Sequence, residues 1–265
     1  MKHPLMIRRT IRFIARHARS PSVWPWVLLF AAGSAWAQNL VVAVDSSLQP
    51  VMLVVARDFE AARSGVKVQW QVGAPGDLLD QMARGKPADV WLGTDTEMSA
   101  SGLLRKLLLP NPRGAFASNR LVLIEPVSGK PPLQRLSDLA QPEVQRVAMG
   151  QVAVEPAGRY ARQAIDGQRL WPLVQRKVVS AGDVRQVLKL VATGEVDAGF
   201  VYGTDAAEAV QRVRVVQMLQ TSAPIAHQAH VAAASRQAAL AEAFVAHLRG
   251  PAAQAALKAA GFGPP

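Results

Sequence analysis

The sequence predicts an α/β protein with two lobes, each built on a mostly parallel sheet flanked by helices. Short apolar segments alternate with amphipathic segments along most of the chain, which indicates strands alternating with helices. The alternation runs in two successive series, the first beginning near Asn39 and the second at Leu121. Half of the 265 residues are apolar, so the chain can bury a large core. These observations favour two α/β lobes over a single sheet.

The first series begins with the apolar strand NLVVAV at residues 39–44. A helix opening at Ser47 is expected next, because the apolar residues after it recur at the spacing of one buried helical face. Pro50 fits the first turn of that helix, where proline is tolerated, and Gly65 ends it. The segments that follow are a strand at 66–72, a glycine-rich turn leading into a helix at 78–84, and a short buried strand at 89–93.

The second series begins with the strand LVLIE, from Leu121 to Glu125. Its later segments alternate in the same way between short apolar stretches and helical periodicity. We expect strands at 146–150, 176–180, 197–203, 212–219 and around Val231, and helices at 156–165, 183–194, 236–248 and 252–260. This alternation predicts a parallel sheet covered by helices on both faces.

The first 37 residues have the features of a secretory signal peptide. They hold six of the 30 bases and no acid, and a basic region ending at Arg19 precedes the apolar run WPWVLLFAAGS. The motif AWA at residues 35–37 follows, as at an A-x-A cleavage site. An uncleaved membrane anchor is the alternative, but the apolar run is shorter than the roughly 20 residues of a spanning helix. We therefore expect cleavage after Ala37 and a soluble, exported product beginning at Gln38.

Composition narrows the possible function classes. The formal net charge is +11, but six bases lie in the expected signal peptide, and no basic run interleaved with aromatic residues appears after it. We therefore expect no binding of nucleic acid. The chain has no cysteine, which excludes disulfides, thiolate metal sites and a cysteine nucleophile. The pair His227 and His230 is a candidate for metal binding, but no nearby acid or cysteine completes a ligand set.

Four junctions between a strand and a helix are candidates for an anion site. Ligands of open α/β sheets bind beyond the carboxyl ends of the strands, where helix N-termini present unpaired N–H groups and a positive dipole end. The junctions are AVDSSL with Ser46 and Ser47, GAPGDLL with Gly76 and Asp77, VEPAGRY with Ala157, and SAGDVRQ with Val184. Each has a plainer interpretation, because serine and aspartate are preferred N-caps of helices. On residue type alone we favour that interpretation for the serines and for Asp77, and Asp183 is the expected cap of the fourth helix.

Tyr202 ends the apolar strand at 197–203 and is therefore expected at the same edge of the sheet. Its phenol could donate one hydrogen bond into the crevice. The alternative is a core tyrosine whose hydroxyl is satisfied by the backbone. Every α/β protein has such junctions, so the residue types alone leave both interpretations open.

Taken together, four segments resemble the periplasmic molybdate-binding proteins of ABC importers. They are AVDSSL at 43–48, GKPADVWLGTD at 85–95, VEPAGRYARQAI at 154–165 and GDVRQVLKLVATGEVDAGFVYGTDA at 182–206, and they follow one another along the whole mature chain. The resemblance implies a periplasmic protein with the type II solute-binding fold, whose two lobes are joined by crossing strands. It implies lobe 1 at residues 38–117 with 228–265, lobe 2 at 118–227, and the ligand in the cleft between them.

The family holds a tetrahedral oxyanion with neutral hydrogen-bond donors, and four of these donors match the sequence. The donors that the resemblance implies are the hydroxyl and N–H of Ser47, the N–H groups of Ala157 and Val184, and the phenol of Tyr202. Ser46 and Gly76 are additional candidates. The ligand would be molybdate or tungstate, bound without a cofactor, a metal ligand or a catalytic residue. The partners would be the permease and ATPase subunits of an ABC importer, and the protein itself would be a monomer.

Two residues depart from the family pattern and leave the identity of the ligand open. Pro75 stands where the family has a second serine that donates through its hydroxyl and N–H, and proline has neither. Losing two hydrogen bonds to a charged group would weaken binding by roughly a hundredfold or more, unless the Gly76 N–H or a water replaces them. Asp45 precedes the serine pair where an alanine is usual, and an acid beside an anion is unfavourable unless it is paired or points away.

The sequence therefore predicts a solute-binding protein that captures an oxyanion and delivers it to an importer, without catalysis. The same fold could instead bind sulfate, phosphate or a small organic acid. An exported α/β enzyme is a third possibility, but it would need a nucleophile or an acid–base pair for which the sequence has no motif. A ligand-sensing subunit of a receptor is a fourth, and capture of its partner would distinguish it from a transport protein.

Overall fold

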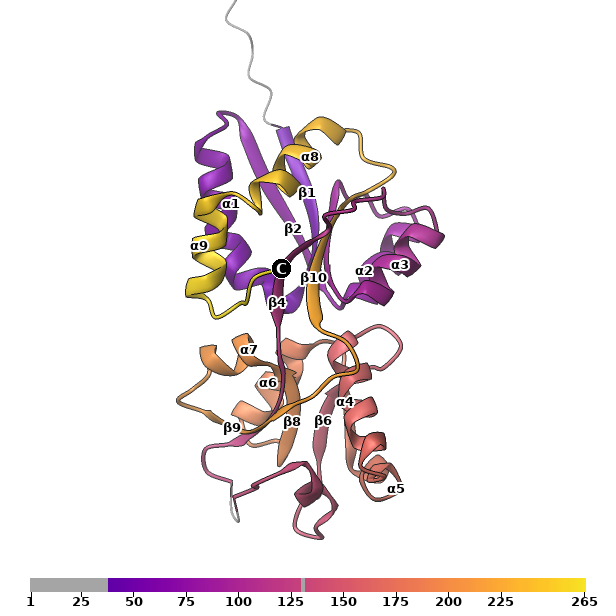
Figure 1. Cartoon of the computed structure of the whole chain (residues 1–265), viewed down its shortest axis with the longest axis vertical. Coiled ribbons are helices and arrows are strands. Elements are labelled where there is room, and N and C mark those ends of the chain that lie inside the picture. The colour runs from indigo at the N-terminus through magenta and orange to yellow at the C-terminus, as the bar shows by residue number, and fades with distance from the viewer. Residues whose placement is uncertain (1–37, 130–131) are drawn as a thin grey trace, which may run out of the picture. The chain divides into compact units, whose positions relative to one another are not determined.

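A computed structural model of the protein describes residues 38–129 and 132–265, so the expected signal peptide lies outside the described residues. Two five-stranded sheets organise this part of the chain. The first has the order β2-β1-β3-β10-β4, and with its helices it is called lobe 1 (Figure 1). Its strands, in that order, are Val66–Gly73, Gln38–Asp45, Val90–Thr94, Ile225–Val231 and Ala115–Asn119.

The second sheet has the order β7-β6-β8-β5-β9, and with its helices it is called lobe 2. Its strands, in that order, are Val178–Ala181, Val147–Gly150, Ala198–Tyr202, Leu121–Pro126 and Val213–Leu219. Every strand that the sequence predicts is present, and β4 is an additional strand. The two-lobed α/β fold class is confirmed.

The chain passes between the lobes through segments that join a strand of one sheet to a strand of the other. β4 ends at Asn119 and β5 begins at Leu121, so one residue separates the two sheets at this crossing. The return crossing runs from β9, which ends at Leu219, to β10, which begins at Ile225. The lobe boundaries expected at 117/118 and 227/228 therefore fall inside β4 and β10, which pair with each other in the first sheet.

Both sheets are mixed, so sheets that the sequence predicts to be mostly parallel also contain antiparallel pairs. β1 is parallel to β2 and β3, whereas β10 is antiparallel to β3 and β4. Likewise β6 is parallel to β7 and β8, whereas β5 is antiparallel to β8 and β9. The reversal has a topological cause: β10 and β5 each enter their sheet from the other lobe rather than through a helical crossover, which parallel neighbours require.

Helices cover both faces of the first sheet (Figure 1). On one face lie α1 (Gln49–Ala61), α8 (Ala238–His247) and α9 (Pro251–Ala259), and on the other lie α2 (Pro75–Ala83) and α3 (Thr96–Leu104). The main core of lobe 1 lies under α1, where Phe59 and Phe244 meet edge to face with ring centroids 5.0 Å apart. A smaller core around Trp91 fills the opposite face.

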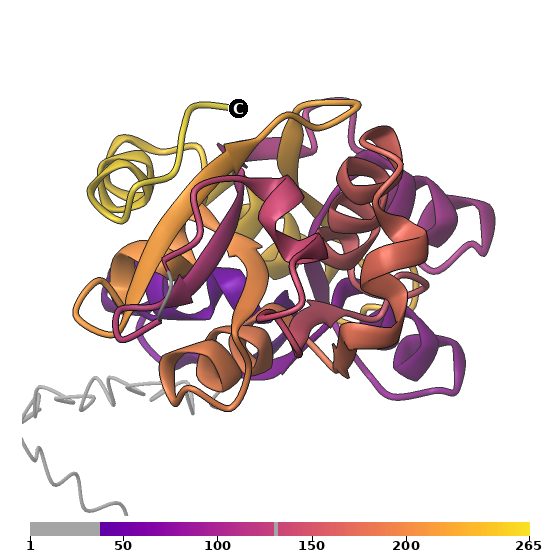
Figure 2. The same ribbon diagram turned by 90° about the horizontal axis from the view of Figure 1, so that it is seen from below.

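The second sheet is covered in the same way, as Figure 2 shows from below. The helices are α4 (Pro156–Gly167) and α5 (Trp171–Val174) on one face, and α6 (Val184–Ala192) and α7 (Gly203–Glu208) on the other; short 3-10 turns lie at Leu136–Ala140 (η2) and Gln175–Lys177 (η3). One core contains Tyr160 and Phe200, and the other contains Val187 and Val201. Strands buried on both faces explain the nearly continuous apolar runs in the sequence.

Two of the predicted helix starts have different outcomes. α6 begins at Val184 with Asp183 as its N-cap, as the sequence predicts. Asp77 is not the N-cap of α2, contrary to the prediction, because the helix begins two residues earlier at Pro75 and its N-cap is Ala74. Proline suits the first helical position, since its fixed φ is helical and it has no N–H to leave unpaired.

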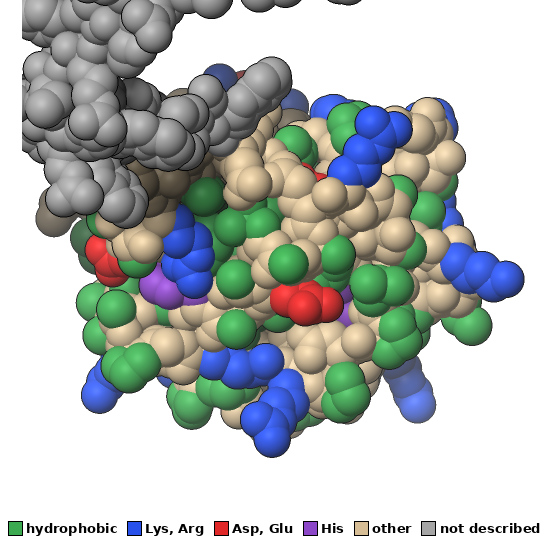
Figure 3. Space-filling model, turned by 90° about the horizontal axis from the view of Figure 1, so that it is seen from above, with side chains coloured by type: hydrophobic (Ala, Val, Ile, Leu, Met, Phe, Trp, Pro, Cys, Tyr) green, Lys and Arg blue, Asp and Glu red, His purple; other side chains and the backbone are tan. Residues whose placement is uncertain are grey.

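Figure 3 shows one face of the molecule from above, on which Lys and Arg side chains are spread among hydrophobic and uncharged ones rather than gathered into a patch. Within the described residues, no helix has both the length and the apolar character needed to cross a bilayer.

Candidate functional site

The first helix start places a buried carboxyl beside the two candidate serines. β1 ends at Asp45, and the chain turns directly into the 3-10 helix η1 (Ser46–Leu48). The N–H and the hydroxyl of Ser47 both donate to Asp45 Oδ1, each over 3.0 Å. Ser46 Oγ is buried, and no residue within 38–129 or 132–265 forms a hydrogen bond with it. Asp45 is therefore the N-cap, which corrects the interpretation of the serines as caps, and the free hydroxyl at this junction belongs to Ser46.

A chain of hydrogen bonds supports Asp45 from the neighbouring strands. Thr94 Oγ1, at the end of β3, donates to Asp45 Oδ2 and lies 2.9 Å from His227 Nδ1 on β10. Because the hydroxyl proton goes to Asp45, the His227 Nδ1–H donates to Thr94. Burial lowers the pKa of His227 to about 3, so the ring is neutral and its Nε2 accepts from Asn119 Nδ2 over 3.3 Å. Asp45 is thus held by neutral partners.

The third helix start is capped by a second buried carboxyl, Glu155. Its Oε1 accepts the Ala157 N–H over 3.2 Å, and its Oε2 is buried without a partner. Close packing holds this side chain, because a Cβ on Gly150 would overlap Glu155, and a Cβ on Gly158 would overlap the backbone of Gly150. The Pro-Ala-Gly sequence therefore serves the approach of α4 to β6 as well as presenting the N–H of Ala157.

The fourth helix start lies against the first. α6 begins at Val184, which is fully buried, and α6 is in contact with η1. The N-cap Asp183 accepts the Gln186 N–H over 3.0 Å. Gln186 is the third residue of the helix, so the N-cap does not take the N–H of Val184. N–H groups in a first turn have no partner within their own helix. The structure thus brings the junctions of Ser46 and Val184, which are far apart in the sequence, to one place between the lobes.

Tyr202 ends β8 with its side chain fully buried, and its hydroxyl has no hydrogen-bond partner in the described part of the chain. Its ring lies nearly perpendicular to that of His227, with the centroids 6.0 Å apart, so it is adjacent to the network behind Asp45. The Tyr202 N–H donates to Asp205 Oδ2 over 3.1 Å. The hydroxyl is not satisfied by the backbone, which was the alternative that the sequence left open.

Three buried oxygen atoms therefore lack hydrogen-bond partners among the described residues where the two lobes meet: Ser46 Oγ, Glu155 Oε2 and Tyr202 Oη. Buried polar atoms normally have hydrogen-bond partners, and each one left without a partner costs about 1–3 kcal/mol. Such atoms from both lobes indicate a place that a hydrogen-bonding ligand completes. The set contains two hydroxyl donors and one carboxyl oxygen.

The glycine-rich turn makes a backbone contact between the lobes. The Gly76 N–H donates to Val154 O over 2.9 Å. A Cβ at Gly76 would lie 2.7 Å from Val154 Cα, so only glycine fits. In this arrangement the Gly76 N–H is used by the other lobe rather than left open to a ligand.

An ion pair joins the lobes beside the same contact. Arg159, in the first turn of α4, pairs with Asp95 at the start of α3 and lies 3.2 Å from Glu97 Oε2. The side chains of Arg159 and Asp95 are largely buried, at 14% and 6% exposure. Asp95 also has a φ of 82°, which is uncommon for a residue with a Cβ and indicates local backbone strain.

Burial and mutual repulsion dominate the electrostatics of the cleft. Burial raises the pKa of Asp45 to about 6. Burial first, and the neighbouring Asp45 second, raise the pKa of Glu155 well above its usual value. Burial also raises the pKa of Asp205 to about 7, although Arg185 opposes this from 3.3 Å. Asp45 and Asp205, with pKa values of about 6 and about 7, therefore exchange protons near neutral pH.

Sequence reasoning identified the helix starts but missed the roles of Glu155 and of Arg159 with Asp95. Glu155 precedes the Pro-Ala-Gly motif, at the N-cap position of a helix beginning with proline, so its position was a usable signal. Arg159 has no such signal in the sequence, because it is the approach of α3 that buries it. That approach could not be read from the sequence.

The two histidines considered as a metal pair hold hydrogen bonds instead. His230 Nε2 lies 2.6 Å from Ser99 Oγ, and its Nδ1 lies 3.0 Å from Leu109 O. His227 bonds to Thr94 as described above. Among the described residues no group of three or more His, Cys, Asp or Glu could hold a metal ion.

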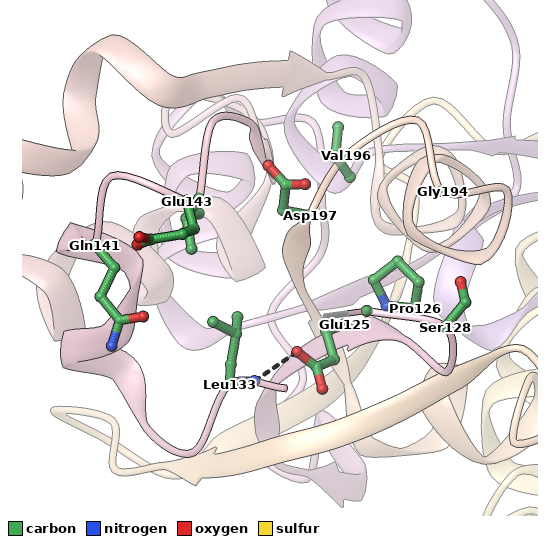
Figure 4. A pocket seen from close by; sticks show the side chains of 11 residues that line it. Glu125, Pro126, Ser128, Leu133, Gln141, Glu143, Gly194, Val196 and Asp197 are labelled. Carbon is green, nitrogen blue, oxygen red and sulfur yellow. Dashed lines mark hydrogen bonds between the residues drawn. The ribbon is translucent and has the colours of Figure 1, made fainter. Parts of the chain in front are cut away.

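A separate cavity of about 230 Å³ lies at the other end of β5 in lobe 2 (Figure 4). Leu121 pairs with Tyr202 at the cleft end of β5, whereas Glu125 lines this cavity. Glu125 accepts the Leu133 N–H over 2.9 Å and pairs with Arg214, and Asp197 accepts two backbone N–H groups. These acids are engaged in structural contacts, so the cavity is a weaker candidate site than the cleft.

Comparison with known proteins places the chain in a family. The family model described as bacterial extracellular solute-binding protein matches residues 40–263. A Bacillus subtilis protein named as an ABC transporter substrate-binding lipoprotein is 31% identical over 63% of this chain and 64% of its own length. The present chain therefore aligns with slightly less than two thirds of that relative.

Two further similarities extend over nearly the whole chain. The molybdate-binding protein ModA of Mycobacterium tuberculosis is 29% identical over 95% of this chain and 93% of its own length. The solved periplasmic molybdate-binding protein of Azotobacter vinelandii superposes with a TM-score of 0.72 at 26% identity, over 85% of this chain and 99% of that one. The resemblance that the sequence motifs indicate is confirmed at the level of the family and the fold.

Proposed function

Because this chain belongs to the family of bacterial extracellular solute-binding proteins, we propose that it captures a tetrahedral oxyanion between its lobes. Molybdate and tungstate are the ligands proposed first, since relatives that align along most of the chain are named as molybdate-binding proteins. The captured anion is delivered to the permease and ATPase subunits of an ABC importer. The protein binds and releases its ligand and catalyses no reaction.

The observation that carries this proposal is the pair of buried hydroxyls without partners, Ser46 Oγ in lobe 1 and Tyr202 Oη in lobe 2. A ligand that accepts from both would join the lobes, which is how a two-lobed binding protein closes on its solute. The first turn of α6 adds the Val184 N–H and the positive end of its helix dipole. The donors of Ser47 and Ala157 are held by Asp45 and Glu155, so the contacts proposed for the ligand are those of Ser46, Tyr202 and Val184.

Neutral donors suit an oxyanion for a physical reason. A buried dianion loses its hydration, and fixed N–H and O–H groups replace it without adding mobile charges. Each such bond to a charged group contributes about 1.5–3 kcal/mol. Donors already aligned by helix starts need little reorganisation, so more of that energy appears as affinity.

A different anion in the same cleft is the second candidate. Pro75 has no N–H to donate, and two carboxyls, Asp45 and Glu155, occupy donors of Ser47 and Ala157. These differences favour an oxyanion or small organic acid whose charge or proton content differs from that of molybdate. Sulfate and phosphate are the inorganic alternatives.

Calorimetric titration with molybdate, tungstate, sulfate and phosphate tests the proposal. The protein is the mature product purified from cells that express the full chain, and N-terminal sequencing checks for cleavage after Ala37. We expect one-to-one binding of molybdate and tungstate in preference to the other two. Binding of none of the four would sink the proposal and direct the search to organic anions. Size-exclusion chromatography with light scattering checks the expected monomer, and affinity capture checks the importer subunits.

A further inference from the structure

We propose that the cleft binds its oxyanion together with one proton, which Glu155 Oε2 shares with an oxygen atom of the ligand. Glu155 is then a specificity-determining residue: it donates to a fully ionised oxyanion when it carries the proton, and it accepts from an oxyanion that brings a proton of its own. This inference rests on the proposed function, because it specifies the chemical form in which that same cleft takes its anion.

The geometry of Glu155 supports this role. The side chain is fully buried, and its Oε1 is committed to the Ala157 N–H over 3.2 Å. Its Oε2 has no donor among the described residues. In a neutral carboxyl whose one oxygen accepts a hydrogen bond, the proton lies on the other oxygen. That oxygen is the unpartnered one, so the O–H of a protonated Glu155 is available to a ligand held between the lobes.

The second buried carboxyl, Asp45, has no oxygen free for this contact. Its Oδ1 accepts both donors of Ser47, and its Oδ2 accepts from Thr94. A carboxyl with donors on both oxygens is suited to carry charge rather than a proton. Glu155 receives only one hydrogen bond. When one of these two buried carboxyls is protonated, Glu155 is therefore the one that carries the proton.

No base in the described chain offsets the charge of Glu155. Neither Glu155 nor Asp45 forms an ion pair with a described Lys or Arg. The bases near the cleft are already engaged, Arg159 with acids of α3 and Arg185 with acids of α7. The other charged or titratable groups that act on Glu155 and its surroundings are Asp45 from β1, Asp183 from the cap of α6, Asp205 from α7 and Tyr202 from β8.

A dianion cannot enter this environment without a compensating proton. Ionised Glu155 and an oxyanion in hydrogen-bond contact would repel each other by several kcal/mol in a partly buried site. The same proton turns that repulsion into a short charge-assisted hydrogen bond. Burial and the charge of Asp45 raise the pKa of Glu155, which favours the protonated carboxyl.

The test is calorimetric titration with molybdate from pH 6 to pH 9, in two buffers of different ionisation enthalpy. The mature wild-type protein is compared with Glu155→Gln, whose amide can donate at every pH. We expect the wild-type affinity to fall with rising pH, approaching tenfold per pH unit, with up to one proton taken up per molybdate. We expect the affinity of Glu155→Gln to be nearly independent of pH and to exceed that of the wild type at pH 9.

A matched control is the variant Glu125→Gln. Glu125 is also a buried glutamate, with 2% exposure, and it lines the separate cavity at the other end of β5. Glu125→Gln should reproduce the wild-type pH dependence, and circular dichroism with thermal melting checks that both variants fold. Wild-type binding without proton uptake at any pH would overturn this inference but leave the proposed function intact. Proton uptake that persists in Glu155→Gln would overturn it in favour of Asp45. Absence of molybdate binding by the wild type throughout would overturn both the inference and the proposed function.

Discussion

The contact between Gly76 and Val154 makes a sharp prediction about closure of the lobes. Gly76→Ala places a methyl group 2.7 Å from Val154 Cα and 2.9 Å from both Val154 Cβ and Val154 O. These atoms belong to a neighbouring turn of backbone and cannot move aside as a flexible side chain could. The two lobes must therefore separate slightly at this point, which also lengthens the 2.9 Å hydrogen bond from the Gly76 N–H.

The magnitude follows from those two effects. Overpacking of a close contact costs about 1–3 kcal/mol, and loss of the hydrogen bond costs about 0.5–1.5 kcal/mol. The contact joins different lobes, so these costs fall on the closed, ligand-bound form rather than on the folding of either lobe. Gly76→Ala should therefore weaken oxyanion binding roughly ten- to a thousandfold, while the Tm of the free protein changes little.

The assay is calorimetric titration of the variant with the oxyanion that the wild type binds, together with thermal melting of the free protein. Gly73→Ala is the matched control in the same turn, because its Cβ would meet only Leu78 at an ordinary 3.7 Å. It should bind like the wild type. The reasoning is refuted if Gly76→Ala and Gly73→Ala bind with equal affinity, or if Gly76→Ala loses thermal stability in proportion to its affinity.

Three further predictions concern single side chains of the cleft. Tyr202→Phe removes a hydroxyl that no protein group uses, so we expect roughly ten- to a hundredfold weaker binding with an unchanged Tm, measured by titration and melting; equal affinity would exclude the phenol as a ligand donor. Arg159→Met breaks the buried pair with Asp95 and should weaken binding at least tenfold, whereas Arg162→Met, at an exposed pair, should not. Burial raises the pKa of Asp45 to about 6, so the folded state holds the proton of this carboxyl more tightly than the unfolded chain does. Protonated Asp45 therefore adds to the free energy of unfolding below pH 4, and this contribution of about 3 kcal/mol at most is lost as the pH rises through 6. Asp45→Asn should make Tm less dependent on pH between pH 4 and pH 6. A Tm that rises equally in the wild type and in Asp45→Asn over this range would contradict the assignment.

The periodicity of the sequence was sufficient to predict the fold class and most elements. Strands such as β8 and helices such as α6 lie within a few residues of their expected bounds, because each buries a face whose apolar spacing is visible locally. The helix α3 was not predicted. It buries only Ser99 and Gly102, which no hydrophobic pattern would reveal.

The same distinction between local features and tertiary contacts applies to the candidate site. The sequence by itself determined which junctions carry exposed N–H groups and hydroxyls, since a cap or a first-turn proline is a local feature. Which of those donors are already taken depends on atoms brought close by tertiary structure. Ser46 and Ser47 are indistinguishable in the sequence, yet the turn at Asp45 satisfies Ser47 and leaves Ser46 Oγ free.

The state of the buried acids shows most clearly what the tertiary structure adds to the sequence. The sequence identifies Asp45 as an acid near a proposed anion, but it cannot say whether the acid is paired, buried or protonated. Only the tertiary structure decides that Asp45 is held by Thr94 and Ser47, and that Glu155 is buried with one oxygen free. The physical reason is that a pKa depends on burial and on charges within a few ångströms, which come from segments more than a hundred residues apart in the chain.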